Sequence, residues 1–286
     1  MTTGPNPNDQ PAIRVRRIHF DYPEGSLARH FVGGDLVMSH VIAYLSATFP
    51  EGEEFFVRSV RRYADSITDP VLAQQVRGFV GQEITHGREH RELNLRLRQM
   101  GYPTRREERT TRWILHVYER ILPPLTCLAI TAALEHFTAV FAETLLQDGR
   151  AQELLGSTEV RSMLLWHAVE ESEHRAVAFD VYRSVGGGER RRIATMCAIL
   201  VLFGTSIVVN STVSLLGDRA TRNPVRLAKS VAAIRHTPFV SRTVRRRVRD
   251  YLKPGFHPDD VDNSALLAQW TAELFGADGS LTDHLH

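Results

Sequence analysis

The sequence predicts an all-α fold built on a four-helix bundle. Helical periodicity recurs along most of the 286 residues, whereas strand-like alternation is confined to a weak pattern at 13–20. The motif Glu-x-x-His occurs twice, as Glu83-Ile-Thr-His86 and as Glu171-Ser-Glu-His174. Residues three apart share one face of a helix. Bundles that hold two metal ions take a Glu-x-x-His from each of two helices and a Glu from each of the other two. The sequence therefore predicts a di-metal site inside the bundle.

Proline, glycine and aspartate residues delimit the predicted helices. Phe49-Pro50 ends the first and Asp69-Pro70 the second, because proline cannot continue a helix. The helices are expected at residues 35–48, 51–68, 71–100, 106–121, 124–147, 158–185 and 193–217. Four of them (51–68, 71–100, 124–147 and 158–185) carry the candidate metal ligands. At about 1.5 Å per residue, each of these four is long enough to cross a bundle.

This order divides the chain into three parts. Residues 1–28 are expected to be largely irregular, 29–188 to form the bundle with a flanking helix, and 189–286 to hold an apolar helix and a basic helical C-terminal region. Residues 1–11 are polar and rich in Pro and Asn, so we expect disorder there and no secretory signal. Cys127 and Cys197 both have apolar neighbours, which indicates a reducing compartment and no disulfide framework.

Periodicity selects the glutamates that face the core. Glu53 shares a stripe with Phe56 and Val60, which is the apolar face of its helix. Glu54 instead aligns with Arg58 on a solvated face, and it is kept as the alternative ligand. The predicted metal ligands are Glu53, Glu83, His86, Glu135, Glu171 and His174.

Metal ions explain why so many acidic side chains face one core. Carboxylates buried close together raise each other's pKa, so four of them require cations between them. Two further imidazoles, His90 and His167, also face inward. They are hydrogen-bond partners of the ligands, additional ligands, or histidines of the core. Glu89 and Glu173 are expected at the surface, and Glu143 faces only partly inward.

The motifs around these residues resemble those of known proteins. Glu170-Glu171-Ser-Glu-His174 resembles the (Asp/Glu)-Glu-x-x-His motif of ferritin-like di-iron proteins, which include ribonucleotide reductase small subunits, soluble desaturases and bacterial monooxygenases. The chain is more closely similar to a bacterial family described as predicted metal-dependent hydrolases. That similarity covers roughly residues 30–210. Its motifs are Phe49-Pro-Glu-Gly-Glu53, Gln82-Glu83-Ile-Thr-His86, Leu134-Glu135-His136 and Trp166-His167-Ala-Val-Glu170-Glu171-Ser-Glu-His174.

The resemblance implies a ferritin-like bundle with two Fe ions, or with Mn or a mixed Fe/Mn pair. Carboxylate-rich ligation with one imidazole per ion suits these metals better than structural zinc. By the same resemblance Glu83 and Glu171 bridge the ions, Glu53 with His86 and Glu135 with His174 are terminal, and Glu170 orients a ligand imidazole.

Four functions are compatible with such a centre. The ligand set favours a di-iron carboxylate enzyme that activates O2 to oxidise an apolar or lipid-like substrate, with an electron donor that the sequence does not identify. A di-metal hydrolase using a metal-bound hydroxide is the alternative. A non-enzymatic iron-handling protein is a further alternative, and a membrane-associated protein with a structural metal is the last.

An apolar segment follows the bundle. Ile193 to Gly217 has no charged residue over 25 positions, which is long enough to cross a bilayer. Arg190-Arg191-Arg192 precedes it, and 219–253 holds eleven Lys or Arg against one acid, Asp250. Positive charge on both sides does not fit a simple single span. The segment is therefore a fifth helix buried on the bundle, a membrane-embedded or interfacial element, or an oligomer contact such as a homodimer.

Charge sets the expected partners and location. The formal net charge is +2 and no nucleic-acid-binding motif is present, so no nucleic acid is expected. An apolar helix beside a basic tail fits an anionic membrane surface. We therefore expect a cytoplasmic protein, peripheral to or embedded in the inner membrane, whose partners are a small apolar substrate and O2.

Overall fold

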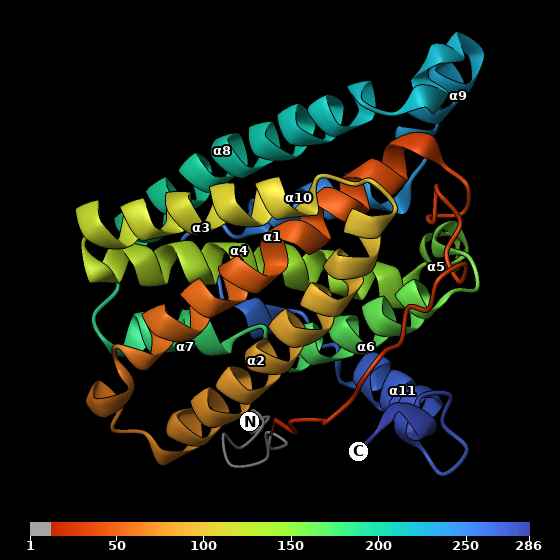
Figure 1. The fold of residues 1–286 in the computed structure, drawn as a ribbon. Coiled ribbons are helices and arrows are strands. Elements are labelled where there is room, and N and C mark those ends of the chain that lie inside the picture. The colour runs from red at the N-terminus through yellow and green to blue at the C-terminus, as the bar shows by residue number, and fades with distance from the viewer. Residues whose placement is uncertain (1–12) are drawn as a thin grey trace.

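The computed structural model describes residues 13–286 and confirms the all-α prediction (Figure 1). Within these residues the β-pairing consists of one isolated bridge, between Ile18 and Leu285. The expected disorder of residues 1–11 lies outside the described part. The helices are α1 (Leu36–Arg61), α2 (Pro70–Gln99), α3 (Thr104–Ile121), α4 (Pro124–Gln147), α5 (Gly149–Leu155), α6 (Glu159–His174), α7 (Val177–Ser184), α8 (Glu189–Leu216), α9 (Pro224–Ile234), α10 (Arg242–Asp250) and α11 (Ser264–Phe275).

Helix α1 runs through Pro50, so the predicted break between 35–48 and 51–68 is wrong. Proline has no amide hydrogen, and it leaves the carbonyl four residues earlier without its helical partner. That carbonyl belongs to Ser46, and the side-chain amide of Asn94 on α2 donates to it at 2.9 Å. A side chain of the neighbouring helix thus replaces the missing backbone hydrogen bond. The second half of α1 carries Glu53.

The single helix predicted at 158–185 is also wrong, because it is divided into α6 and α7 at Arg175 and Ala176. The buried guanidinium of Arg175 pairs with Glu143 on α4 at 2.6 Å and with Asp259 at 3.0 Å. Both partners lie far away in the sequence, so helical periodicity could not reveal them. Because the helix is interrupted at Arg175, the ligand candidate His174 is the last residue of α6.

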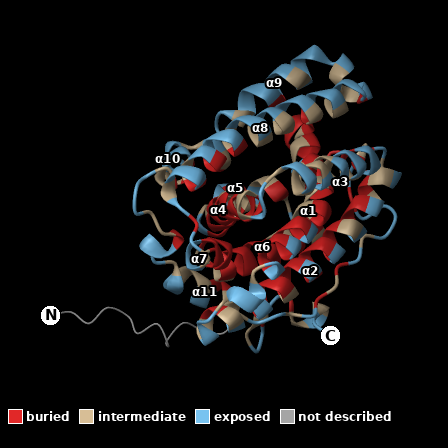
Figure 2. Ribbon diagram, turned by 90° about the vertical axis from the view of Figure 1, so that its left-hand side faces the viewer, coloured by how far each residue is buried: buried red, intermediate tan, exposed pale blue. Residues whose placement is uncertain are grey.

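Four helices, α1, α2, α4 and α6, pack around the middle of the molecule. Figure 2 shows the buried residues concentrated where these helices meet. Two apolar clusters pack around this region, one containing Phe20 and Trp166 and the other Phe55 and Phe79. The polar side chains described below contact both clusters, since the ring of His86 lies 5.0 Å from that of Trp166 and the ring of His174 lies 4.9 Å from that of Phe79.

Helix α8 packs along α1 and α4 at the edge of the molecule (Figures 1 and 2). Among the described residues, α4 and α8 are the helices long and apolar enough to cross a membrane, but their burial differs. In α4, 67% of the most apolar stretch is buried, because α4 is a core helix, whereas in α8 the buried share is 17%. Of the three alternatives for 193–217, a helix buried on the bundle does not fit this low burial, although one side of α8 does pack on α1 and α4.

Candidate metal centre

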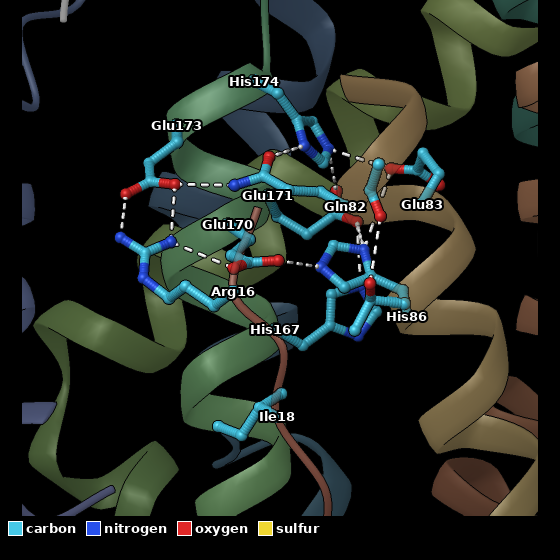
Figure 3. A network of polar contacts seen from close by, with 12 residues as sticks. Arg16, Ile18, Gln82, Glu83, His86, His167, Glu170, Glu171, Glu173 and His174 are labelled. Carbon is cyan, nitrogen blue, oxygen red and sulfur yellow. Dashed lines mark hydrogen bonds and ion pairs between the residues drawn. The ribbon is translucent and has the colours of Figure 1, made fainter. Parts of the chain in front are cut away.

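Six side chains from four helices converge in the middle of the bundle, and Figure 3 labels Glu83, His86, Glu171 and His174 among them. They are Glu53 of α1, Glu83 and His86 of α2, Glu135 of α4, and Glu171 and His174 of α6. Each is at most 3% exposed. These are the six residues predicted as metal ligands, and the structure brings all of them together. They meet because each lies on the inward stripe of its own helix.

Helices α1 and α2 come close together at this point. A Cβ atom added to Gly87 would lie 3.1 Å from Glu53 Oε2, so a larger residue on α2 would crowd this carboxylate. The neighbouring Glu54 is exposed and pairs with Arg58 and Arg91 instead. The structure therefore places Glu53 at the centre and Glu54 at the surface.

Two carboxylates lie between the two imidazoles. Glu171 Oε1 is 3.7 Å from His86 Nδ1, and Glu171 Oε2 is 3.7 Å from His174 Nε2. Glu83 Oε1 is 3.8 Å from His86 Nδ1 and 3.1 Å from His174 Nε2. Glu135 Oε2 lies 3.3 Å from His174 Nε2 alone. Glu83 and Glu171 thus occupy positions from which each could contact two ions, one beside each imidazole.

The hydrogen-bonding state of these groups fits metal ions. Nine of their buried atoms have no hydrogen-bond partner among residues 13–286. They are both carboxylate oxygens of Glu53, Glu83 and Glu135, together with Glu171 Oε2, His86 Nδ1 and His174 Nε2. A buried polar atom without a partner costs about 1–3 kcal/mol. All nine atoms belong to the six converging residues, and each can donate an electron pair. Divalent cations bound among them would therefore give all nine atoms a partner.

The electrostatics of the cluster point the same way. Burial raises the pKa of Glu53 well above its usual range, and the carboxylates of Glu83 and Glu171 raise it further. Burial, followed by the charge of Glu171, raises the pKa of Glu135 to about 7. Burial alone would also raise the pKa of Glu171, but the hydrogen bond from His167 and the nearby charge of His174 lower it well below its usual range. Positive charge at the centre would stabilise all these carboxylates in their ionised form.

A second layer of side chains orients the two imidazoles. His86 Nε2 donates to Glu170 Oε2 at 3.1 Å, and His174 Nδ1 donates to Gln82 Oε1 at 2.8 Å. These hydrogen bonds leave His86 Nδ1 and His174 Nε2 as the nitrogens that face the carboxylates. Arg16 in turn binds Glu170 at 3.0 Å (Figure 3). Arg16 and Gln82 were not predicted as site residues. Gln82 directly precedes Glu83, but no sequence pattern points to Arg16.

Of three further acidic residues, Glu89 and Glu173 do not lie where the sequence predicted. Glu89 is buried rather than exposed and accepts a hydrogen bond from the amide of Phe20 at 3.0 Å. Glu173 is partly buried and pairs with Arg16 at 2.6 Å. Glu143 is buried but is ion-paired with Arg175 instead of facing the centre. The two errors share a cause, because the extended segment 13–20 covers α2 and α6, which periodicity within a helix does not show.

The two additional histidines lie on one side of the centre. His167 Nε2 donates to Glu171 Oε1 at 2.8 Å. Ring nitrogens of His167 and His90 are 2.9 Å apart, and His90 Nδ1 lies 2.9 Å from Ser46 Oγ. Both histidines therefore belong to a hydrogen-bonded row that starts at Glu171. His167 also lies within reach of a cation shared with Glu53 and His86, so additional ligation by His167 stays a prediction.

Comparison with known proteins now identifies the family. A family model described as "predicted metal-dependent hydrolase" matches residues 14–262. The chain belongs to this family. No curated protein and no solved structure matches the chain. The match confirms the resemblance carried by the motifs and extends over all four ligand-bearing helices and over α8 to α10. It supports a metal-dependent enzyme, whereas iron as the metal stays a prediction.

A second group of buried histidine and aspartate residues lies elsewhere in the protein and is already neutralised by arginines. His30 and His40 lie 3.2 Å and 3.3 Å from Asp218 Oδ2, close enough to suggest a metal site. Arg29 also donates to Asp218 Oδ2 at 3.0 Å, and Arg226 donates to His30 Nδ1 at 2.8 Å. Two guanidinium groups therefore already supply the positive charge. This group links the start of α1 to the end of α8 and offers little to a cation.

A cavity of about 470 Å³ adjoins the metal centre. Side chains of α1, α4, α6 and α8 form most of its wall, and most of them are apolar. Phe49, Phe141 and Phe203 are among them, and Glu171 and His167 line the cavity as well. An apolar cavity that also contacts a few convergent polar groups is the usual form of a small-molecule site.

Proposed function

We propose that this protein is a di-metal enzyme that hydrolyses an apolar substrate bound in the cavity beside the centre. The observation that carries the proposal is the position of Glu171. It is one of the six converging residues, and it also lines the 470 Å³ apolar cavity. The description of the family supports hydrolysis as the reaction. A substrate in the cavity would place its reactive group beside Glu171 and keep its apolar part among the aromatic walls.

The six converging residues would hold two divalent ions. When bound, such ions polarise a substrate oxygen and lower the pKa of a water molecule so that it can attack at neutral pH. His167 Nε2 donates a hydrogen bond to Glu171 Oε1, and Glu171 Oε2 stays free to bind the ions. Glu170 and Gln82 fix the tautomers of His86 and His174. The mostly apolar walls of the cavity would bind the apolar part of the substrate and so position its reactive group beside Glu171.

Oxidation by O2 is a second candidate, favoured by the donor set. Four carboxylates and two imidazoles converge, and neither cysteine is among them. Oxygen and imidazole donors without thiolate suit Fe(II) and Mn(II). Two Glu-x-x-His motifs facing inward in a bundle are also the arrangement of di-iron and di-manganese carboxylate proteins. The same apolar substrate would then be oxidised, with two Fe ions as the cofactor and an external electron donor.

One experiment separates the two reactions. The purified protein is stripped of metal and reloaded anaerobically with Fe(II), Mn(II) or Zn(II), and the bound metal is counted. Each form is then given chromogenic esters of increasing acyl-chain length without O2. In parallel, O2 uptake is measured with a chemical reductant present. Metal-dependent ester cleavage without O2 would support hydrolysis. O2 uptake by the Fe(II) form alone, without ester cleavage, would replace hydrolysis by oxidation.

Two variants make this test specific to the centre. Glu171→Ala removes a carboxylate that faces both imidazoles, so we expect it to abolish binding of the metal pair together with either activity. Glu92→Gln changes an exposed glutamate of α2 and serves as the matched control. Full occupancy by two metal ions in Glu171→Ala would contradict the site assignment itself.

A further inference from the structure

One side of α8 forms an exposed surface without charge. Its exposed residues recur every three or four positions from 194 to 216, so they lie along a single face. The large apolar ones are Val201, Leu202, Val208, Val209, Val213 and Leu216. Val201 and Val208 are 66% exposed and Leu216 is 75% exposed. This face, called the α8 stripe below, is about 33 Å long at 1.5 Å per residue.

Basic residues lie at both ends of the α8 stripe. Arg190 and Arg191 are exposed at its start, and Arg219 and Arg222 are exposed just after its end. Exposed Lys and Arg residues continue through α9 and α10. From 190 to 249 the sequence has one acidic residue, Asp218, which is buried and paired with Arg29. The segment 190–249 is therefore positively charged and has no exposed acid, and Glu189 just before it is ion-paired with Arg183 and Arg192.

The α8 stripe also adjoins the cavity. Val208 and Thr212 belong to the exposed face of α8 and line the cavity at the same time. Val240, on the 3₁₀ turn Pro238–Val240, is 38% exposed and lines it as well. On the inner side of α8, Ile207 forms part of the cavity wall. The same part of α8 thus forms both the exposed α8 stripe and a wall of the cavity.

We propose that the α8 stripe docks on an anionic lipid membrane, with α8 lying in the plane of the interface. An apolar helix face flanked by basic residues binds such membranes by burial of apolar area and by attraction to anionic headgroups. Large exposed apolar surfaces of this kind mark interaction sites. An apolar substrate would then pass from the lipid into the cavity beside Val208 and Val240. This last step rests on the proposed function, whereas the docking does not.

The charges favour a membrane over a second copy of the chain. A symmetric pair of α8 helices packed along their stripes, parallel or antiparallel, would bring basic ends against basic ends, because both ends are positive. An anionic surface has the complementary charge. The other side of α8 also argues for lying on the membrane rather than crossing it. Ser206 bonds Tyr44 at 2.6 Å and Ser214 bonds His40 at 2.7 Å, so this side belongs to the bundle.

Vesicle flotation tests the docking. The full-length protein is mixed with vesicles of phosphatidylglycerol and phosphatidylcholine, or of phosphatidylcholine alone, at low and high salt. We expect binding to the anionic vesicles that weakens with salt. Val201→Glu and Val213→Glu, which change the stripe but not the cavity lining, should abolish it. Leu95→Glu, at a 48% exposed leucine of α2, is the matched control and should bind like the wild type. Replacing Arg190 or Arg222 by Gln should weaken binding about fivefold each, or about 1 kcal/mol.

Cys197 offers a second, independent readout. It is an exposed free cysteine on the α8 stripe, whereas Cys127 is buried. A polarity-sensitive fluorophore attached to Cys197 should shift to shorter wavelength when anionic vesicles are added, and lipids carrying a quencher should quench it. An unchanged spectrum while the protein floats with the vesicles would show that another surface binds them, and would overturn the proposal.

The remaining outcomes of these experiments also test the docking proposal. No flotation with anionic vesicles would overturn the docking. A stable dimer in solution that Val201→Glu converts to a monomer would replace the membrane by a second copy of the chain. Neither measurement uses catalysis, so a failure of the proposed chemistry would leave the docking result unaffected. Conversely, a wild-type protein that binds vesicles but turns over soluble and vesicle-bound substrates equally well would overturn the passage of substrate from the lipid.

Discussion

His86 Nε2 and Glu170 Oε2 lie 3.1 Å apart in the interior of the bundle. A carboxylate accepts hydrogen bonds when ionised, so this contact places the proton of the imidazole on Nε2 and the lone pair on Nδ1. Arg16 binds the other oxygen of Glu170 at 3.0 Å. Burial raises the pKa of Glu170 to about 6, and without the opposing charge of Arg16 it would be higher. Arg16 therefore keeps this carboxylate able to accept at neutral pH.

The first prediction concerns this contact. Glu170→Ala should weaken metal binding about 10–100-fold, which is the usual cost of removing a side chain that orients a ligand imidazole. Glu170→Gln should weaken it less, since the amide oxygen can still accept from Nε2. Equilibrium dialysis against Mn(II) measures both, with Glu92→Gln as the surface control. Unchanged affinity in Glu170→Ala would show that His86 is not a ligand or is held in place by other contacts.

The second prediction concerns stability without metal. The pKa of Glu135 is raised to about 7 by burial and by Glu171, so its stabilising contribution is complete below pH 4.5 and is lost as pH rises through 7. The loss is on the order of 3 kcal/mol. Glu135→Gln removes this titrating charge. In the presence of a chelator, urea unfolding at pH 7.5 should therefore find the variant more stable than the wild type, with the difference shrinking at pH 5.

Metal should reverse the order of stability in the same experiment. With excess Mn(II) the wild type gains the free energy of binding at four carboxylates, whereas Glu135→Gln has lost one ligand. The wild type should then be the more stable of the two at pH 7.5. A variant that is less stable both with and without metal would mean that Glu135 stabilises the fold by itself and would remove the argument for a cation beside it.

Helical periodicity was enough to predict that these six residues face one another inside the bundle. A site at the centre of a bundle requires each ligand to lie on the inner face of its own helix, and this information is local. Glu53 rather than Glu54 follows from the apolar stripe alone. Arg16 could not be found in this way, since it reaches Glu170 from an extended segment 154 residues away. The same holds for Glu89, which that segment covers.

The errors about helix boundaries and about α8 have other physical causes. Pro50 was taken as a helix end because the compensating donor, Asn94, lies on another helix. In α8, apolar residues occupy nearly every face, so periodicity does not show which side packs on the bundle. Even the polar residues Ser206 and Ser214 face the protein rather than the solvent. Composition alone therefore could not distinguish a core helix from a surface one.

The third prediction is a pH dependence at His136, which follows Glu135 in the chain but whose side chain contacts Arg247 and Tyr251 instead of the metal centre. Burial lowers the pKa of His136 to about 4, although its Nε2 donates to the carbonyl of Arg247 at 3.0 Å. A depressed pKa means that the stabilising contribution is present above pH 6.5 and is lost as pH falls through 4, by about 3 kcal/mol in all. His136→Gln keeps a donor but does not titrate. The stability difference between wild type and variant should therefore shrink by this amount from pH 7 to pH 4.

The control for this measurement is His116→Gln, at an exposed histidine of α3. It should leave the slope of stability against pH as in the wild type. Urea denaturation followed by circular dichroism at each pH gives the slopes. Equal slopes for the wild type and His136→Gln would show that water reaches His136 or that its surroundings open before the protein unfolds.

The fourth prediction concerns the cavity. Ala142 of α4 lines it, and Ala142→Phe would fill part of its 470 Å³ without touching the six converging residues. Excluding two methylene groups of a bound apolar chain costs about 1.6 kcal/mol, which is more than tenfold in affinity. We expect weaker binding of a long-chain fluorescent fatty-acid probe, little change for a short-chain one, and unchanged metal content. Equal loss for both probes would indicate that the variant disturbs the fold instead of shortening the cavity.

The fifth prediction connects Pro50 to the site. Asn94 donates from Nδ2 to the carbonyl of Ser46, and its Oδ1 accepts from Ser46 Oγ at 2.8 Å. The same Ser46 Oγ contacts His90, which is hydrogen-bonded to His167. Asn94→Leu leaves a buried carbonyl without a partner, which should cost about 1–3 kcal/mol of stability. It should also loosen the row of side chains that ends at Glu171.

A double-mutant cycle isolates the role of the proline in this prediction. In Pro50→Ala the amide of residue 50 can bond the Ser46 carbonyl again, so that carbonyl no longer depends on Asn94. Asn94→Leu should therefore cost less in the Pro50→Ala background than in the wild type, and the difference is the coupling between the two residues. Additive effects would mean that the Asn94 hydrogen bond to Ser46 does not compensate for the proline. Strong coupling would show that the helix tolerates Pro50 because α2 supplies a donor next to the metal centre.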